Sequence, residues 1–156
     1  MVFSSELSFV MQGPIITDSK ASCVTSAAIE SIRKFFPNSQ LVLSTWKFTD
    51  LSVLPTALID DIVISDDPGD ETPVGYTKIN INRQLVSVRA GLSKTNRRYV
   101  VKTRTDLIFE NDNLVRLLNA VDSPASDSKF VTQPVVVSNL STRAHHRQMK
   151  VPFWVC

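Results

Sequence analysis

The segment Tyr99-Val100-Val101-Lys102-Thr103-Arg104-Thr105-Asp106 is an apolar run that ends in two cations and a carboxylate. Its β-branched and aromatic residues predict a strand over residues 99–103. In an open α/β sheet, ligands bind in the crevice beyond the carboxyl ends of the strands, so these charges follow the strand where a phosphate or a metal ion could be bound. At this point, a strand end that is only solvated explains the charges equally well.

Apolar runs and helical patterns alternate along the chain on both sides of this strand. Strands are expected at residues 7–11, 41–46, 61–65, 99–103 and 130–138. Helices are expected at residues 21–36, 51–58, 79–94 and 113–121, and the third groups Leu85, Val88 and Leu92 on its apolar face. Right-handed crossovers turn such an alternation into a covered, mostly parallel sheet. The predicted fold class is α/β, a Rossmann-like three-layer sandwich formed by a single domain over residues 1–156.

Length, composition and charge restrict the partners. A chain of 156 residues with 43% hydrophobic residues suits one domain with a workable core. Residues 1–80 carry five Lys and Arg against ten Asp and Glu, a net of −5, whereas residues 81–156 carry twelve against five, a net of +7. This asymmetry indicates an anionic partner for the second half. The basic residues lack the aromatic interleaving of a nucleic-acid groove, so a phosphorylated small molecule fits better and no nucleic acid is expected.

Cysteine usage and the N-terminus indicate the compartment. Cys23 and Cys156 are the only cysteines, which suggests no disulfide framework and a reducing environment. The N-terminal apolar stretch has no basic leader and is interrupted at Gln12, Gly13 and Pro14, which argues against a signal peptide. No segment is long and apolar enough to span a bilayer. We therefore expect a cytoplasmic protein without a transmembrane segment.

Polar residues gather where the predicted strands end. The chain has four glycines, none of them in a G-x-G-x-x-G or Walker pattern, so a ligand must be held by side chains and strand-end loops. In a parallel sheet these strand ends share one edge, and the first turn of the helix at 79–94 meets the same edge. The candidate binding residues are Gln12, Gly13, Asp66, Asp67, Asn82, Arg83, Lys102 and Arg104.

Each candidate suits a particular contact. Arg83 can hold a phosphate in a bidentate way, which Lys cannot. Asp66 and Asp67 can accept from a base N–H or a ribose hydroxyl, although a solvated loop explains them as well. Gly13 allows the backbone to approach a ligand closely, or forms an ordinary turn with Pro14. Trp46 could stack on a base, although packing in the core is the commoner use of a strand-end tryptophan.

Six short segments in this order resemble one family. They are Met11-Gln12-Gly13-Pro14-Ile15, Ser31-Ile32-Arg33-Lys34-Phe35-Phe36-Pro37-Asn38, Leu43-Ser44-Thr45-Trp46, Asp67-Pro68-Gly69, Asn80-Ile81-Asn82-Arg83-Gln84 and Lys102-Thr103-Arg104-Thr105-Asp106. Together they are similar to the WavE lipopolysaccharide-synthesis family, whose members are regarded as glycosyltransferases. The resemblance spans nearly the whole chain, and Pro152-Phe153-Trp154-Val155 resembles the point where that family continues into a second half.

The resemblance implies a GT-A-like fold, of which this chain supplies the nucleotide-binding half. It implies a nucleotide-sugar donor, a glycan acceptor of the lipopolysaccharide or other surface-polysaccharide kind, and a C-terminal acceptor half that the chain lacks. It also leaves open a peripheral association with a membrane. In such enzymes a D-x-D-type motif holds Mg²⁺ or Mn²⁺ against the diphosphate. Here the motif reads R-T-D, so Asp106 takes the second acidic place and Arg104 the first.

Two arrangements of charge remain open at the R-T-D motif. Asp106 alone can tether a hard divalent cation through its oxygens, together with the phosphates of the substrate. Alternatively, Lys102, Arg104 and Arg83 neutralise the leaving diphosphate directly. Two other functional classes also remain: a non-catalytic nucleotide-binding module, and a flavodoxin-like or receiver-type signalling domain in which clustered aspartates bind Mg²⁺.

Overall fold

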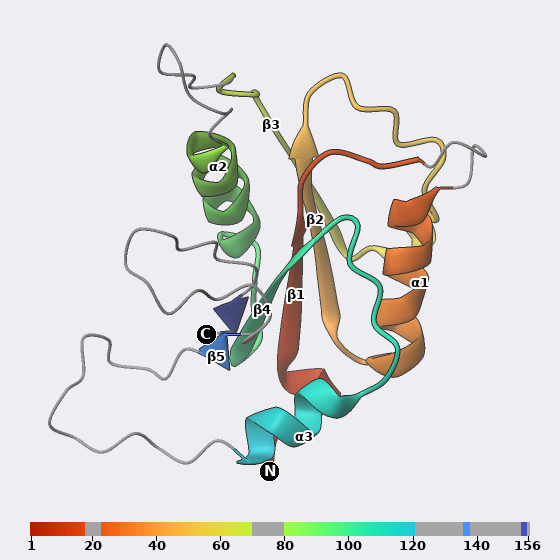
Figure 1. Cartoon of the computed structure of the whole chain (residues 1–156), viewed down its shortest axis with the longest axis vertical. Helices are drawn as coiled ribbons and strands as arrows, with labels where there is room; N and C mark the ends of the chain where they lie inside the picture. The colour runs from red at the N-terminus through yellow and green to blue at the C-terminus, as the bar shows by residue number, and fades with distance from the viewer. Residues whose placement is uncertain (18–22, 70–79, 121–135, 138–153, 156) are drawn as a thin grey trace, which may run out of the picture.

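A computed structural model describes residues 1–17, 23–69, 80–120, 136–137 and 154–155, which form a central sheet with helices on both faces (Figure 1). The strands lie in the order β3-β2-β1-β4-β6-β5. The elements are η1 (Ser4–Glu6), β1 (Leu7–Gln12), α1 (Val24–Phe35), β2 (Gln40–Trp46), η2 (Thr56–Leu58), β3 (Asp61–Ser65), α2 (Ile81–Leu92), β4 (Tyr99–Arg104), α3 (Asn113–Ala120), β5 (Val136–Val137) and β6 (Trp154–Val155).

The centre of the sheet is parallel. Strand β1 pairs in parallel with β2 on one side and β4 on the other, and β2 pairs in parallel with β3. At the other edge, the two-residue strands β6 and β5 add in antiparallel fashion. The order 3-2-1-4 is that of a doubly wound sheet, in which the chain reverses direction across the sheet between β1 and β4. The prediction of an α/β, Rossmann-like and mostly parallel sheet is confirmed.

The main hydrophobic core lies between the sheet and the layer that contains α1 and α3 (Figure 1). Strand β1 contributes Phe9, whose ring centroid lies 4.9 Å from that of Phe36 and 5.5 Å from that of Phe109. Helix α3 is tied to the N-terminus, because the Val2 N–H donates to Asn119 Oδ1 at 2.6 Å. This layer therefore closes the sheet from one side and leaves the other side to α2.

Arg33 joins the end of α1 to the beginnings of two strands. Its guanidinium donates to the carbonyl oxygens of Leu58 and Ser39 and to Asp60 Oδ2, each at 2.7 Å. A planar fork with several donors can satisfy three acceptors at once, which an ammonium on a flexible stem does less well. The same Asp60 oxygen accepts the Leu41 N–H, so α1, β2 and β3 are held in one arrangement.

Helix α2 covers the opposite face of the sheet with a surface of small residues. Ser87 and Gly91 are buried against β1 and β2, whereas Leu85 is 63% exposed and Leu92 is 41% exposed. The apolar face that the sequence indicates for this helix is therefore not the face that meets the sheet. A Cβ at Gly91 would collide with Val10 and would lie 3.3 Å from the Ser44 Cβ. The absence of a side chain lets α2 lie close to β1.

Several element boundaries differ from expectation for clear reasons. The short turn of helix expected within 51–58, interrupted by Pro55, is the single 3₁₀ turn η2 directly after that proline. Strand β6 was not predicted, since a two-residue strand carries no periodicity. Of the strand expected at 130–138, only β5 lies within the described residues. None of the described helices is long and apolar enough to cross a membrane.

Replacing Gly91 with Ala tests the close packing of α2. The added methyl group meets Val10, and overpacking of this kind costs about 1–3 kcal/mol. The gain in helix propensity of alanine over glycine offsets about 1 kcal/mol of that cost. We expect a net loss of stability in chemical unfolding, and a smaller loss when the same substitution is made in a Val10→Ala background, where the methyl group has room. Additive effects of the two substitutions would contradict this contact.

Candidate functional site

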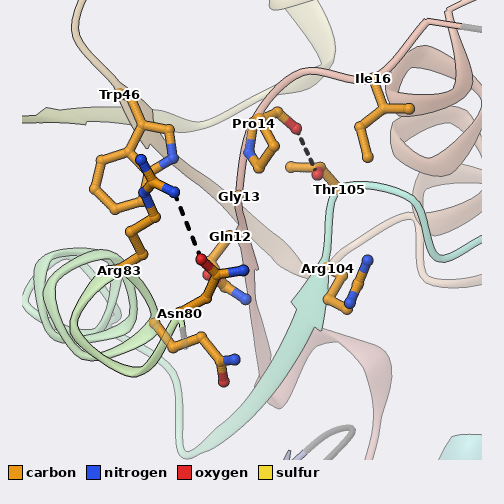
Figure 2. A pocket seen from close by; sticks show the side chains of 10 residues that line it. Gln12, Gly13, Pro14, Ile16, Trp46, Asn80, Arg83, Arg104 and Thr105 are labelled. Carbon is orange, nitrogen blue, oxygen red and sulfur yellow. Dashed lines mark hydrogen bonds between the residues drawn. The ribbon is translucent and has the colours of Figure 1, made fainter. Parts of the chain in front are cut away.

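A pocket of about 210 Å³ lies at the carboxyl edge of the parallel strands, around the end of β1 (Figure 2). Loops after β1 and β4, the end of β2 and the first turn of α2 all contribute to it. This is the switch point of a 3-2-1-4 sheet, where ligands of doubly wound proteins bind. The lining residues are Gln12, Gly13, Pro14, Ile16, Trp46, Asn80, Arg83, Gln84, Arg104 and Thr105.

Gln12 is the last residue of β1, and its orientation is set by α2. Its side chain is 8% exposed, and Gln12 Oε1 accepts a buried hydrogen bond of 2.7 Å from the Ser87 hydroxyl. The Ser44 hydroxyl in turn donates to the Ser87 carbonyl at 2.7 Å. Since a buried polar group must find partners, these bonds link the end of β1 to the helix and hold the amide in the pocket wall.

Gly13 follows Gln12 in a conformation that favours glycine, with φ of 131°. A Cβ at this position would lie 3.1 Å from Thr105 Oγ1. The Thr105 hydroxyl donates to the Pro14 carbonyl at 2.7 Å, which ties the loop after β1 to the loop after β4. Thr105 was not among the residues expected from the sequence, because only the pairing of β1 with β4 brings the two loops together.

Arg83 lies on the α2 side of the pocket, where Figure 2 shows it beside Trp46 and Asn80. Its guanidinium binds the Asp67 carboxylate in a bidentate way, with Nε to Oδ1 and Nη2 to Oδ2 both at 2.7 Å. The hydrogen bonds from Arg83 hold the pKa of Asp67 below its usual value. Two residues predicted independently as ligand contacts are therefore partners of each other.

Arg104 lies across the pocket, at the end of β4 (Figure 2). It binds the carboxylate of Asp106 in the same way, at 2.8 Å from Nε to Oδ1 and 2.6 Å from Nη2 to Oδ2. The hydrogen bond from Arg104 lowers the pKa of Asp106, and the same bond raises the pKa of Arg104. The R-T-D motif is thus folded into an ion pair within itself.

Lys102 lies two positions before the end of β4 and is 6% exposed. It is level with Val10 of β1, on the face of the sheet that α2 covers, and it does not line the pocket. Burial lowers the pKa of Lys102, and the nearby charge of Arg104 lowers it further. Its charge is close enough to Arg104 to add to the positive potential beneath the pocket.

Two other expected residues lie outside the pocket lining. Asp66 pairs with Lys47 at 2.7 Å, and its side chain is 80% exposed, in keeping with the solvated-loop interpretation. Asn82 belongs to the first turn of α2 but does not line the pocket. Among the ten lining residues, the predicted ones are Gln12, Gly13, Arg83 and Arg104.

Trp46 lines the pocket and is only partly buried, which differs from the commoner core packing. Trp46 is the last residue of β2, at the edge of the sheet where the pocket lies. Asn80 and Gln84 join the lining because the first turn of α2 faces the strand ends, as expected for that turn. Pro14 was expected only as part of a turn with Gly13, and Ile16 carries no sequence signal that distinguishes it from an ordinary loop residue.

The described part of the chain has no group of three side chains that could by themselves hold a divalent cation. Mg²⁺ and Mn²⁺ prefer oxygen ligands, and no three His, Cys, Asp or Glu side chains come together among the described residues. Both oxygens of Asp106 already accept hydrogen bonds from Arg104. The metal-binding role of Asp106 stays a prediction that this arrangement does not favour.

The fold and the pocket define a doubly wound α/β protein with a pocket lined by residues at the strand ends. The family described as WavE lipopolysaccharide synthesis matches the chain over residues 7–156. The chain belongs to this family, which confirms the resemblance and assigns it to lipopolysaccharide synthesis. A search of curated proteins finds no match.

Replacing Lys102 with Met tests the cost of its buried charge. Methionine has a similar length and no charge, so the variant avoids the desolvation of an ammonium group. We expect its thermal midpoint at pH 7 to exceed that of the wild type by several degrees, since 1 kcal/mol corresponds to about 2–4 °C for a domain of this size. The exposed Lys94→Met is the matched control and leaves the midpoint nearly unchanged.

The difference in stability between the wild type and Lys102→Met depends on pH in a defined direction. The folded state lowers the pKa of Lys102 from 10.5, so at a pH just below that value the unfolded chain binds more protons than the folded one. Stability of the wild type then rises with pH in this window, and the advantage of Lys102→Met shrinks. An advantage that stays constant up to pH 10.5 would contradict the buried-charge explanation.

Proposed function

We propose that the pocket binds the diphosphate-bearing part of a nucleotide-sugar donor. In this proposal the chain is a glycosyltransferase-type domain that serves the transfer of a sugar to a glycan acceptor in lipopolysaccharide or another surface polysaccharide. The observation that carries the proposal is the position of Arg83 and Arg104 on two sides of one pocket at the switch point of the sheet. Membership of the WavE family supports the glycan context.

The size of the pocket limits what it holds. Sites for whole drug-sized ligands measure about 300–1,000 Å³, whereas this pocket measures about 210 Å³. It therefore suits one portion of a nucleotide-sugar, and two guanidinium groups select the charged portion. The amide of Gln12 and the glycine backbone at Gly13 add polar contacts between the two arginines.

The chemistry of sugar transfer explains why cations are placed here. When the bond between the sugar carbon and the diphosphate oxygen breaks, negative charge develops on the departing nucleoside diphosphate. Fixed positive groups that meet this charge stabilise the transition state more than the ground state. Arg83 and Arg104 are the groups in the pocket that can do so, and Lys102 adds positive potential from below.

A non-catalytic nucleotide-binding module remains the alternative. It would bind the same ligands without hydrolysing or transferring a sugar, so a turnover assay with the bound nucleotide-sugar separates the two. The receiver-type alternative is disfavoured, because Asp66 and Asp67 each pair with a cation instead of forming an acidic cluster with a third carboxylate. Acetyl phosphate is accordingly not expected to label the protein.

Thermal shift measurements with nucleoside diphosphates and their sugars, each with and without Mn²⁺, test the proposal. A ligand that binds only the folded state stabilises it by about 2.7 kcal/mol at 100 times its dissociation constant. We expect at least one nucleoside diphosphate or its sugar to raise the midpoint, and the parent nucleoside without phosphate to have a much smaller effect. No shift with any member of the panel would overturn the proposal.

Replacing Arg83 with Ala tests the arginine contact. Loss of one charge-assisted, bidentate contact to a phosphate is expected to weaken binding about tenfold or more. The control is Arg89→Ala, which removes the same charge from an exposed position of the same helix, outside the pocket lining. Isothermal titration with the best ligand of the panel gives both dissociation constants. Equal weakening in the two variants would indicate only a general effect of charge.

A further inference from the structure

Both arginines of the pocket already hold an anion. Arg83 presents Nε and Nη2 to the two oxygens of Asp67, and Arg104 presents the same pair of nitrogens to the two oxygens of Asp106. Two parallel N–H donors are also the arrangement with which arginine binds phosphate. Each carboxylate therefore occupies the position that a phosphate group of a ligand would take on the guanidinium.

The two carboxylates lie outside the lining of the pocket. Both arginines line the pocket, whereas neither Asp67 nor Asp106 does. Asp67 lies in the loop after β3, and Asp106 lies in the loop after β4. A phosphate group that enters the pocket can therefore bind the same two nitrogens after the guanidinium turns from its carboxylate toward the pocket.

The ion pairs are exposed enough to exchange easily. The side chain of Asp67 is 39% exposed and that of Asp106 is 31% exposed. Arg104 itself is 58% exposed. Solvent-exposed ion pairs contribute little to stability, because water and salt screen them and the side chains lose freedom in forming them. A dianionic diphosphate offers each arginine a stronger partner than a single carboxylate.

We propose that Asp67 and Asp106 are internal counter-ions, which the diphosphate of the ligand displaces from Arg83 and Arg104 without a divalent cation. This inference rests on the proposed function and names its ligand chemistry, a diphosphate group. It also assigns Asp106 a role opposite to that of a metal ligand. The carboxylate competes with the ligand, so its removal strengthens binding, whereas removal of a metal ligand weakens it.

The test measures binding of inorganic pyrophosphate, and of the best nucleoside diphosphate from the thermal panel, by isothermal titration. The variants are Asp67→Asn and Asp106→Asn, whose amides keep the size of the side chain and remove its charge. In the presence of EDTA we expect each variant to bind about two- to fivefold more tightly than the wild type. This factor corresponds to the small free energy of a weak, exposed ion pair that the ligand no longer has to break. Arg104→Lys, which keeps the charge but not the fork, is expected to bind more weakly.

Asp112→Asn is the matched control, because it removes a carboxylate from an exposed position ahead of α3 and so changes the net charge equally. Its dissociation constant is expected to equal that of the wild type. Equal tightening in Asp112→Asn would reduce the effect to net charge and overturn the inference. Thermal unfolding of each variant without ligand shows that it is folded, so a weakened variant cannot be mistaken for an unfolded one.

The remaining outcomes separate the inference from the proposed function. If the wild type binds a probe and both asparagine variants bind it equally well or more weakly, the counter-ion role is overturned. The proposed donor pocket is then unaffected. If Asp106→Asn weakens ligand binding only when Mn²⁺ is present, the counter-ion role is also overturned, and Asp106 is identified as a metal ligand instead. Failure of the wild type and of every variant to bind either probe overturns the diphosphate pocket itself.

Discussion

The close contact of α2 with β1 is the constraint on which the pocket depends. At Gly91 the helix has no side chain, and Val10 fills the space that a Cβ would need. The close approach of α2 to β1 allows the Ser87 hydroxyl to donate to Gln12 at the end of the strand. The first turn of the helix, with Arg83, is thereby held beside the strand ends. An added methyl group at Gly91 would push α2 away from β1 and so separate the two walls of the pocket that these elements form.

The packing of the strands and of α2 also sets the positions of the charges around the pocket. Parallel pairing of β1 with β4 places Arg104 level with Gln12, and α2 brings Arg83 to the other side. Each arginine is balanced by an aspartate from a loop outside the pocket, so the protein holds two fixed cations without a large uncompensated charge. Lys102 is the exception, since it is buried and its pKa is lowered by burial. Burial of such a charge costs stability, because the ammonium group loses its hydration.

Family and fold contribute different parts of the functional conclusion. A doubly wound sheet hosts many unrelated activities, so the fold indicates where a ligand binds and not which one. The WavE family supplies the biological context, lipopolysaccharide synthesis. The pocket supplies the chemistry, because a small site between two arginines suits an anionic group better than a base or a neutral sugar. The proposed donor pocket is consistent with all three, and its ligand is the part that the binding experiments test.

The sequence by itself determined the alternation of strands and helices, and hence the parallel sheet and the edge at which Gln12, Arg83 and Arg104 meet. These follow from local periodicity and from the rule that parallel strands end together. Only the tertiary structure decided which face of α2 packs, that Thr105 ties two loops together, and that Asp67 pairs with Arg83. These contacts join residues far apart in the chain. They depend on the distances between α2, the strands and their loops, which no local pattern encodes.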